Sequence, residues 1–136
     1  MCSMSAMVKT LSINGGIMKD KIKETITTIL YLDSTDEIRD RTQLFTELGL
    51  SSIDYIDLCF ELKQQFGKEV GQDDLWPINK MLRNKSYYDK NQWTDVGWER
   101  VCATLKLDST SEKIPIQKLY EFFTVDYIEN RLRELV

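Results

Sequence analysis

The sequence predicts an all-α fold, and three observations support this prediction. Apolar residues recur at helical spacing in separate stretches, and residues that begin or end helices lie at the edges of those stretches. No convincing stretch alternates apolar and polar residues as a half-buried strand does. The 136 residues are 42% hydrophobic and 29% charged, which is typical of one globular domain with a useful core. We therefore expect a single helical bundle.

The first helix is expected at residues 18–31, MKDKIKETITTILY, because apolar residues line one side and lysines and acids the other. The apolar side consists of Ile22, Ile26, Ile29 and Leu30. Residues 1–17 are expected to form a flexible N-terminal extension. Residues 32–49 are rich in Asp, Ser and Thr, which predicts a long polar loop that ends at Gly49.

The second helix, expected from about Ser51 to Phe66, is apolar on two sides. At 100° per residue, one apolar stripe is predicted to face the core. This stripe consists of Tyr55, Leu58, Cys59, Leu62 and Phe66. A second stripe lies too far round the helix to share that burial, and an acidic stripe fills the remaining side. The second stripe is Ile53, Ile56 and Phe60, and the acidic one is Asp54, Asp57 and Glu61. Such a helix is either deeply buried or contacts another molecule.

Two serines begin this helix, and their predicted roles differ. Ser51 suits the N-cap, with Asp54 three residues later as its capping-box partner. Ser52 is then the first helical residue, with its hydroxyl free and pointing outward. Gly67 is a plausible glycine just past the helix end.

The 43 residues from Gly71 to Lys113 are expected to add short helices. Asp74 and Pro77 suit one helix start, and Thr94 can cap another helix. The apolar residues of the two stretches are Leu75, Ile78, Met81 and Leu82, then Trp98, Val101, Cys102 and Leu105. All three tryptophans lie here. They either pack this segment onto the bundle, or form a docking surface or an extended wall for a bound chain.

A last helix is predicted after Thr124, which can cap it. The residues expected on its buried side are Val125, Ile128, Leu132 and Leu135.

Composition excludes several classes of function. The net charge of −4 argues against a nucleic-acid partner. The absence of histidine leaves no Ser-His-Asp triad, Cys-His pair or histidine metal ligand, and no metal site is expected. No apolar run reaches the roughly 20 residues of a membrane span. Three widely spaced cysteines indicate a reducing compartment, so we expect a cytoplasmic protein without a signal peptide. An enzyme is not favoured.

The stretch ELGLSSIDYIDLCFELKQQFGKEV, residues 47–70, resembles the second-helix signature of acyl carrier proteins. The match covers Leu48, Gly49, Ser52, Ile53, Asp54, Ile56, Asp57, Leu58, Leu62, Phe66, Glu69 and Val70. The resemblance resumes at IPIQKLYEFFTVDYIENRL, residues 114–132, and residues 18–32 match the first helix. It implies a four-helix bundle over residues 18–136, with one or two additional helices from an insertion at 71–113.

The resemblance implies a carrier protein rather than an enzyme. Ser52 would carry 4′-phosphopantetheine, transferred from coenzyme A by a holo-synthase (a phosphopantetheinyl transferase), and the arm's thiol would hold acyl groups as thioesters. Acyl-transferring or condensing enzymes of fatty acid or specialised lipid biosynthesis would be its partners, and the protein would be a monomer. Partner-binding residues would be Glu47, Ile53, Asp54, Ile56, Asp57, Phe60 and Glu61. The acyl pocket in the bundle interior would be lined by Leu58, Leu62 and Phe66.

Two departures from the family pattern keep alternatives open. Ser51 stands where the family usually has Asp, which removes a charge that the holo-synthase meets. The insertion at 71–113 replaces a short link and points to a specialised carrier. The alternatives are a carrier of amino acids or polyketide intermediates, and an unmodified scaffold with the carrier fold.

Overall fold

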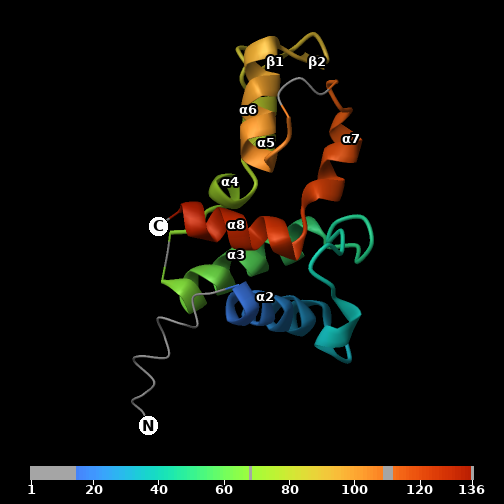
Figure 1. Cartoon of the computed structure of the whole chain (residues 1–136), viewed down its shortest axis with the longest axis vertical. Helices are drawn as coiled ribbons and strands as arrows, with labels where there is room; N and C mark the ends of the chain where they lie inside the picture. Colours follow the sequence, from blue (N-terminus) through green and yellow to red (C-terminus); the bar gives the residue numbers. More distant parts are fainter. Residues whose placement is uncertain (1–14, 68, 109–111, 136) are drawn as a thin grey trace.

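The computed structural model describes residues 15–67, 69–108 and 112–135, and the all-α class is confirmed. Three helices of the bundle lie one above another (Figure 1). These are α2 (Gly15–Leu30), α3 (Ser52–Phe66) and α8 (Val125–Glu134). The remaining helices are η1 (Thr35–Glu37), α4 (Gln72–Leu75), α5 (Ile78–Leu82), α6 (Asp95–Leu105), α7 (Ile116–Leu119) and η2 (Tyr120–Phe122).

The bundle core is aliphatic and comes from the predicted stripes. Helix α2 packs against both α3 and α8. The fully buried side chains of these helices include Ile22, Ile26, Leu58, Leu62, Val125, Ile128 and Leu132. The Thr124 hydroxyl caps α8 by accepting the backbone N–H of Tyr127 at 3.1 Å, as predicted. Helical periodicity therefore identified the buried face of each of these helices.

Two interactions hold the long loop between α2 and α3 against the start of α8. The backbone N–H of Leu44 donates to the carbonyl of Phe123 at 3.0 Å, and that of Asp126 donates to Asp40 at 3.0 Å. Lys19 of α2 lies 2.9 Å from the Asp126 carboxylate, which ties α2 to the start of α8. These contacts fix the position of the loop that leads into α3.

The first helix begins earlier than residue 18, because Gly15, Gly16 and Ile17 are already helical. Periodicity could not find this extra turn, since glycine has low helix propensity and Ile17 is exposed. The expected N-terminal extension lies mostly outside the described residues, at positions 1–14. The helix ends at Leu30, and Tyr31 follows with a left-handed backbone, φ 56°.

The 71–113 segment holds three helices, α4, α5 and α6, where the sequence predicted one or two. The stretch that looked like one helix is divided at Trp76, whose extended backbone has φ −132° and ψ 81°. The cause is Pro77, because a proline disfavours helical backbone in the residue before it. In Figure 1, α5 and α6 rise away from the bundle and α7 returns to it.

A small hairpin between α5 and α6 was not predicted. Strands β1 (Tyr88–Asp89) and β2 (Gln92–Trp93) pair antiparallel. Lys90 and Asn91 between them both have positive φ, as a two-residue hairpin turn with the right twist requires. Two residues per strand are too few to show an alternating pattern.

The three tryptophans of the segment are buried and do not form an exposed docking surface. Trp76 is 1% exposed, Trp93 3% and Trp98 4%. Trp76 reaches the bundle: its ring centroid lies 5.4 Å from that of Phe123 and 5.3 Å from that of Tyr127. None of the helices among the described residues combines the length and apolar character needed to cross a membrane.

Candidate functional site

The start of α3 is built as the sequence predicted. The Ser51 hydroxyl accepts the Asp54 backbone N–H at 3.1 Å, and the Asp54 carboxylate accepts the Ser51 backbone N–H at 3.0 Å. This capping box satisfies orphan backbone donors of the first turn. Gly49 has φ 69°, a conformation that other residues rarely adopt, and this lets the chain turn into the helix. Gly67 ends the helix with φ 65°.

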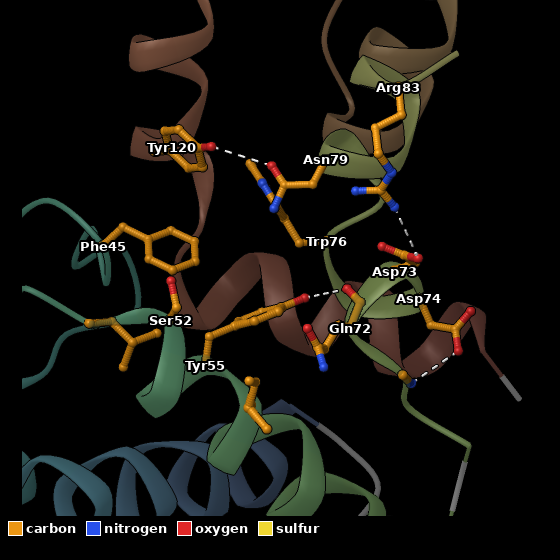
Figure 2. Close-up of a pocket in the computed structure, with 13 residues that line it drawn as sticks. Phe45, Ser52, Tyr55, Gln72, Asp73, Asp74, Trp76, Asn79, Arg83 and Tyr120 are labelled. Carbon is orange, nitrogen blue, oxygen red and sulfur yellow. Dashed lines mark hydrogen bonds and ion pairs between the residues drawn. The ribbon is translucent and has the colours of Figure 1, made fainter.

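Ser52 is exposed and lies at the mouth of a cleft. Its neighbour Ser51 makes the capping bond, so the Ser52 hydroxyl is not needed for that purpose. Figure 2 shows the hydroxyl turned toward the cleft, beside the Phe45 ring. The cleft has a volume of about 820 Å³ and lies between the start of α3 and the helices α4 and α5. Other lining residues are Leu50, Tyr55, Ile56, Gly71, Gln72, Asp73, Asp74, Trp76, Asn79, Arg83 and Tyr120.

Tyrosine hydroxyl groups connect the two walls of the cleft. Tyr55 of α3 donates to the backbone carbonyl of Gln72, and Tyr120 of η2 donates to the Asn79 side-chain oxygen at 3.3 Å. Burial raises the pKa of the Tyr55 hydroxyl, so this group stays protonated and keeps its donor role. Burial likewise raises the pKa of the nearby Cys59 thiol to about 11. A buried, protonated thiol is a poor nucleophile.

The second apolar stripe of α3 faces solvent, as its angular position predicted. Ile53 is 71% exposed, Ile56 46% and Phe60 58%. Asp57 is also exposed, and Glu61 is half-buried. Asp57, Phe60 and Glu61 border a groove with Glu24, Ile29 and Tyr31, among others. Acidic and apolar groups therefore share this face.

The other two acids predicted to meet partners have local hydrogen bonds. Asp54 is half-buried and completes the capping box. Glu47 is exposed and accepts the backbone N–H of Gln43 at 2.9 Å. Their roles toward partners stay predictions.

The residues predicted to line an acyl pocket lie in the bundle interior. Leu58 and Leu62 are fully buried, and Phe66 is half-buried. None of the three lines the cleft beside Ser52. An acyl chain would have to separate packed side chains to reach them, and this role stays a prediction.

Sequence reasoning missed the polar wall of the cleft. This wall consists of Gln72, Asp73, Asn79 and Arg83. In the sequence they resemble ordinary surface residues, and only folding brings them opposite Ser52 (Figure 2). The only signal was the concentration of tryptophans in the segment, which suggested a wall for a bound chain.

The site suits a phosphodiester on Ser52. A negative charge at the first residue of α3 lies in the positive end of the helix dipole, an effect of about 0.3–1 kcal/mol. The exposed hydroxyl and the adjoining cleft leave room for a chain attached there. Across residues 15–67, 69–108 and 112–135, no group of His, Cys, Asp and Glu side chains is arranged to hold a metal ion.

Comparisons with known proteins identify relatives of this chain. A family described as "Phosphopantetheine attachment site" matches residues 20–80. The acyl carrier protein of Thermotoga maritima is 30% identical over 70 residues, which cover 52% of this chain and 85% of that protein. The acyl carrier protein of Solidesulfovibrio magneticus is 27% identical over 73 residues, 54% of this chain and 92% of that protein. No solved structure matches the chain significantly.

Proposed function

This chain belongs to the acyl carrier protein family, and from that premise we propose that Ser52 is the residue that carries its prosthetic arm. The protein has a carrier function, and its cofactor is covalently attached 4′-phosphopantetheine. The arm supplies a thiol that holds acyl groups as thioesters. Ser52 is supported by its exposed position on α3, because Ser51 next to it is engaged in the capping box.

The proposed pathway is fatty acid or specialised lipid biosynthesis, and the proposed partners are a holo-synthase and acyl-transferring or condensing enzymes. The exposed stripe of Ile53, Ile56 and Phe60 beside Asp57 supports this proposal. Acidic groups steer a basic partner into contact, while a small apolar patch gives a contact that releases readily. The protein itself performs no catalysis in this proposal. A cytoplasmic location fits the free, buried thiols of Cys59 and Cys102.

The insertion at 71–113 also stays a proposal. The matches cover 92% and 85% of the two acyl carrier proteins but only 54% and 52% of this chain. This chain therefore has residues that those relatives lack, which supports an insertion. The family match ends at residue 80, within the segment. Helix α8, which packs on α2 in the bundle, begins only at Val125, so the segment lies between two parts of the bundle.

Attachment to Ser52 can be tested by intact mass after co-expression with a promiscuous phosphopantetheinyl transferase. We expect a gain of one phosphopantetheine in the wild-type protein and in Ser51→Ala, and no gain in Ser52→Ala. The two serines are adjacent, so each variant is a matched control for the other. A gain that persists in Ser52→Ala would contradict the assignment. No gain with any transferase would favour the unmodified scaffold, the alternative that Ser51 in place of Asp keeps open.

The partner surface can be tested with Phe60→Asp. We expect the far-ultraviolet circular dichroism to match wild type while the rate of arm transfer by the holo-synthase falls. Val96→Asp is the matched control, because Val96 of α6 is 59% exposed and Phe60 58%. Unfolding of Phe60→Asp, or an equal loss of rate in both variants, would contradict the proposed surface.

A further inference from the structure

We infer that the cleft beside Ser52 docks the phosphopantetheine arm together with a short acyl group that carries a polar substituent. This inference deepens the proposed function and rests on it, since the arm must be attached to Ser52. The cleft volume of about 820 Å³ lies within the roughly 300–1,000 Å³ that is common for ligand sites. Ser52 is itself one of the lining residues, so an attached chain enters the cleft directly.

One wall of the cleft is aromatic and rigid. Phe45 and Tyr120 pack edge to face at 5.5 Å between ring centroids, and Tyr120 stacks on Trp76 at 6.0 Å. Behind them, Phe123 is fully buried and stacks on Phe45 at 4.6 Å between ring centroids. This wall therefore offers flat apolar surface to a chain attached at Ser52.

The opposite wall is polar and comes from the 71–113 segment. Gln72, Asp73, Asn79 and Arg83 supply amide, carboxylate and guanidinium groups. Arg83 lies 3.7 Å from the Asp73 carboxylate, and it is the only cationic side chain among the described residues that line the cleft. The phosphopantetheine arm has amide groups and a hydroxyl between apolar stretches, so it matches a cleft with one polar and one apolar wall.

The same composition disfavours a long saturated acyl chain in this cleft. An alkyl chain would displace water from the polar wall and leave its groups without hydrogen-bond partners, which is unfavourable. A hydroxyl or other polar substituent near the thioester can bond to Asn79 or Arg83 instead. Figure 2 shows Arg83 at the far end of the cleft from Ser52, where the end of an attached chain would lie. Arg83 is thus inferred to be a specificity-determining residue.

The polar wall is held in place before any cargo arrives. Tyr127 donates to the Leu75 carbonyl at 2.7 Å, and the Arg131 guanidinium group donates to the Asp74 carbonyl at 3.2 Å through Nε. Together with the bond from Tyr55 to Gln72, these contacts join α4 to α3 and α8. A wall fixed in advance binds with less loss of conformational freedom.

The test uses protein loaded with 3-hydroxybutyryl- or octanoyl-phosphopantetheine by a promiscuous transferase, with loading verified by intact mass. Nuclear magnetic resonance then compares apo and loaded protein. For the hydroxyacyl form, and not for the octanoyl form, we expect the largest shift changes at Gln72, Asp73 and the side-chain amide of Asn79. We also expect hydroxylamine to cleave the hydroxyacyl thioester faster in Arg83→Ala than in wild type, by about twofold to tenfold, the effect of losing one hydrogen bond.

Lys80→Ala is the matched control. It removes the same charge from the same segment, but Lys80 does not line the cleft, so its cleavage rate should equal that of wild type. Loaded protein whose shift changes fall on Leu58 and Leu62 would overturn the inference and leave the proposed function intact. Equal cleavage rates for Arg83→Ala and Lys80→Ala would overturn the role of Arg83. Failure to load the arm at all would overturn both the inference and the proposed function.

Discussion

The helical bundle and the 71–113 segment are stabilised in different ways. Among the described residues, the bundle buries mainly aliphatic side chains of α2, α3 and α8, and each helix repeats the same apolar spacing. The segment relies on buried tryptophans, a hairpin and tyrosine-to-carbonyl hydrogen bonds. The bundle holds the proposed attachment serine, while the segment supplies the polar wall opposite it. If the proposed attachment is correct, the bundle sets where the arm is attached, and the segment shapes the space beside it.

The largest effect is expected from a cavity in the bundle. Leu58→Ala removes a fully buried side chain and should lower the free energy of unfolding by about 2–5 kcal/mol. Urea denaturation followed by circular dichroism measures this. Phe60→Ala on the same helix is the control, with an expected change within about 0.5 kcal/mol, because Phe60 is exposed. Similar losses in both variants would mean that α3 is buried on two sides.

A smaller effect, confined to the segment, is expected from Gly97→Ala. A Cβ at this position would lie 1.9 Å from the backbone oxygen of Tyr87, so α6 and the hairpin would have to separate. Overpacking of this kind destabilises by about 1–3 kcal/mol. Hydrogen exchange should speed up in α6 and leave α2 unchanged, and Glu99→Ala on the exposed side of α6 should change neither. Faster exchange throughout the molecule would show that the two regions unfold as one unit.

The junction between the two regions can be weakened by Tyr127→Phe. The change leaves the buried Leu75 carbonyl without the Tyr127 donor, and should destabilise the protein by about 1–3 kcal/mol. Burial raises the pKa of the Tyr127 hydroxyl, so the donor is present throughout the ordinary pH range. Faster hydrogen exchange in α4 would report the loss. Tyr31→Phe, at a 91% exposed position, should have no effect.

Helix caps allow the same chemistry to be compared in both regions. Ser51→Ala removes the cap of α3. Thr94→Ala removes the cap of α6, because the Thr94 hydroxyl accepts the Gly97 N–H at 3.0 Å. Each should destabilise by about 1 kcal/mol. Thermal denaturation measures both, and hydrogen exchange locates the loss in α3 or α6 respectively. A Ser51→Ala protein as stable as wild type would contradict the capping assignment.

The smallest effect on stability is expected from the ion pairs of Asp40, and it should disappear at low pH. The Lys23 ammonium group 2.8 Å away, joined by Lys19, holds the pKa of Asp40 below its ordinary value. A lowered folded-state pKa contributes stability above the unfolded-state pKa, and this contribution is lost as pH falls through the folded-state pKa. Asp40→Asn should therefore be slightly less stable than wild type at pH 6 and equal to it at pH 2. Urea midpoints at the two values measure this, and a difference that persists at pH 2 would rule out the ionic origin.

The sequence alone was sufficient for the features that depend on neighbours close in the chain. The capping box at Ser51, the exposed stripe of Ile53, Ile56 and Phe60, and the start of α8 at Thr124 were all predicted. Each depends on residues within one or two helical turns, where spacing determines direction. The proposed attachment at Ser52 also follows from its place as the first residue of the helix, next to the capping Ser51, and from the family resemblance.

Only the tertiary structure decided how the 71–113 segment meets the bundle. Gln72, Asn79 and Arg83 belong to the cleft because Tyr55 and Tyr120 bring distant parts of the chain together. Such pairings join residues that are up to 41 positions apart, and no periodicity encodes them. Helix positions follow from local spacing, whereas the shape of the cleft depends on which long-range packing has the lowest free energy.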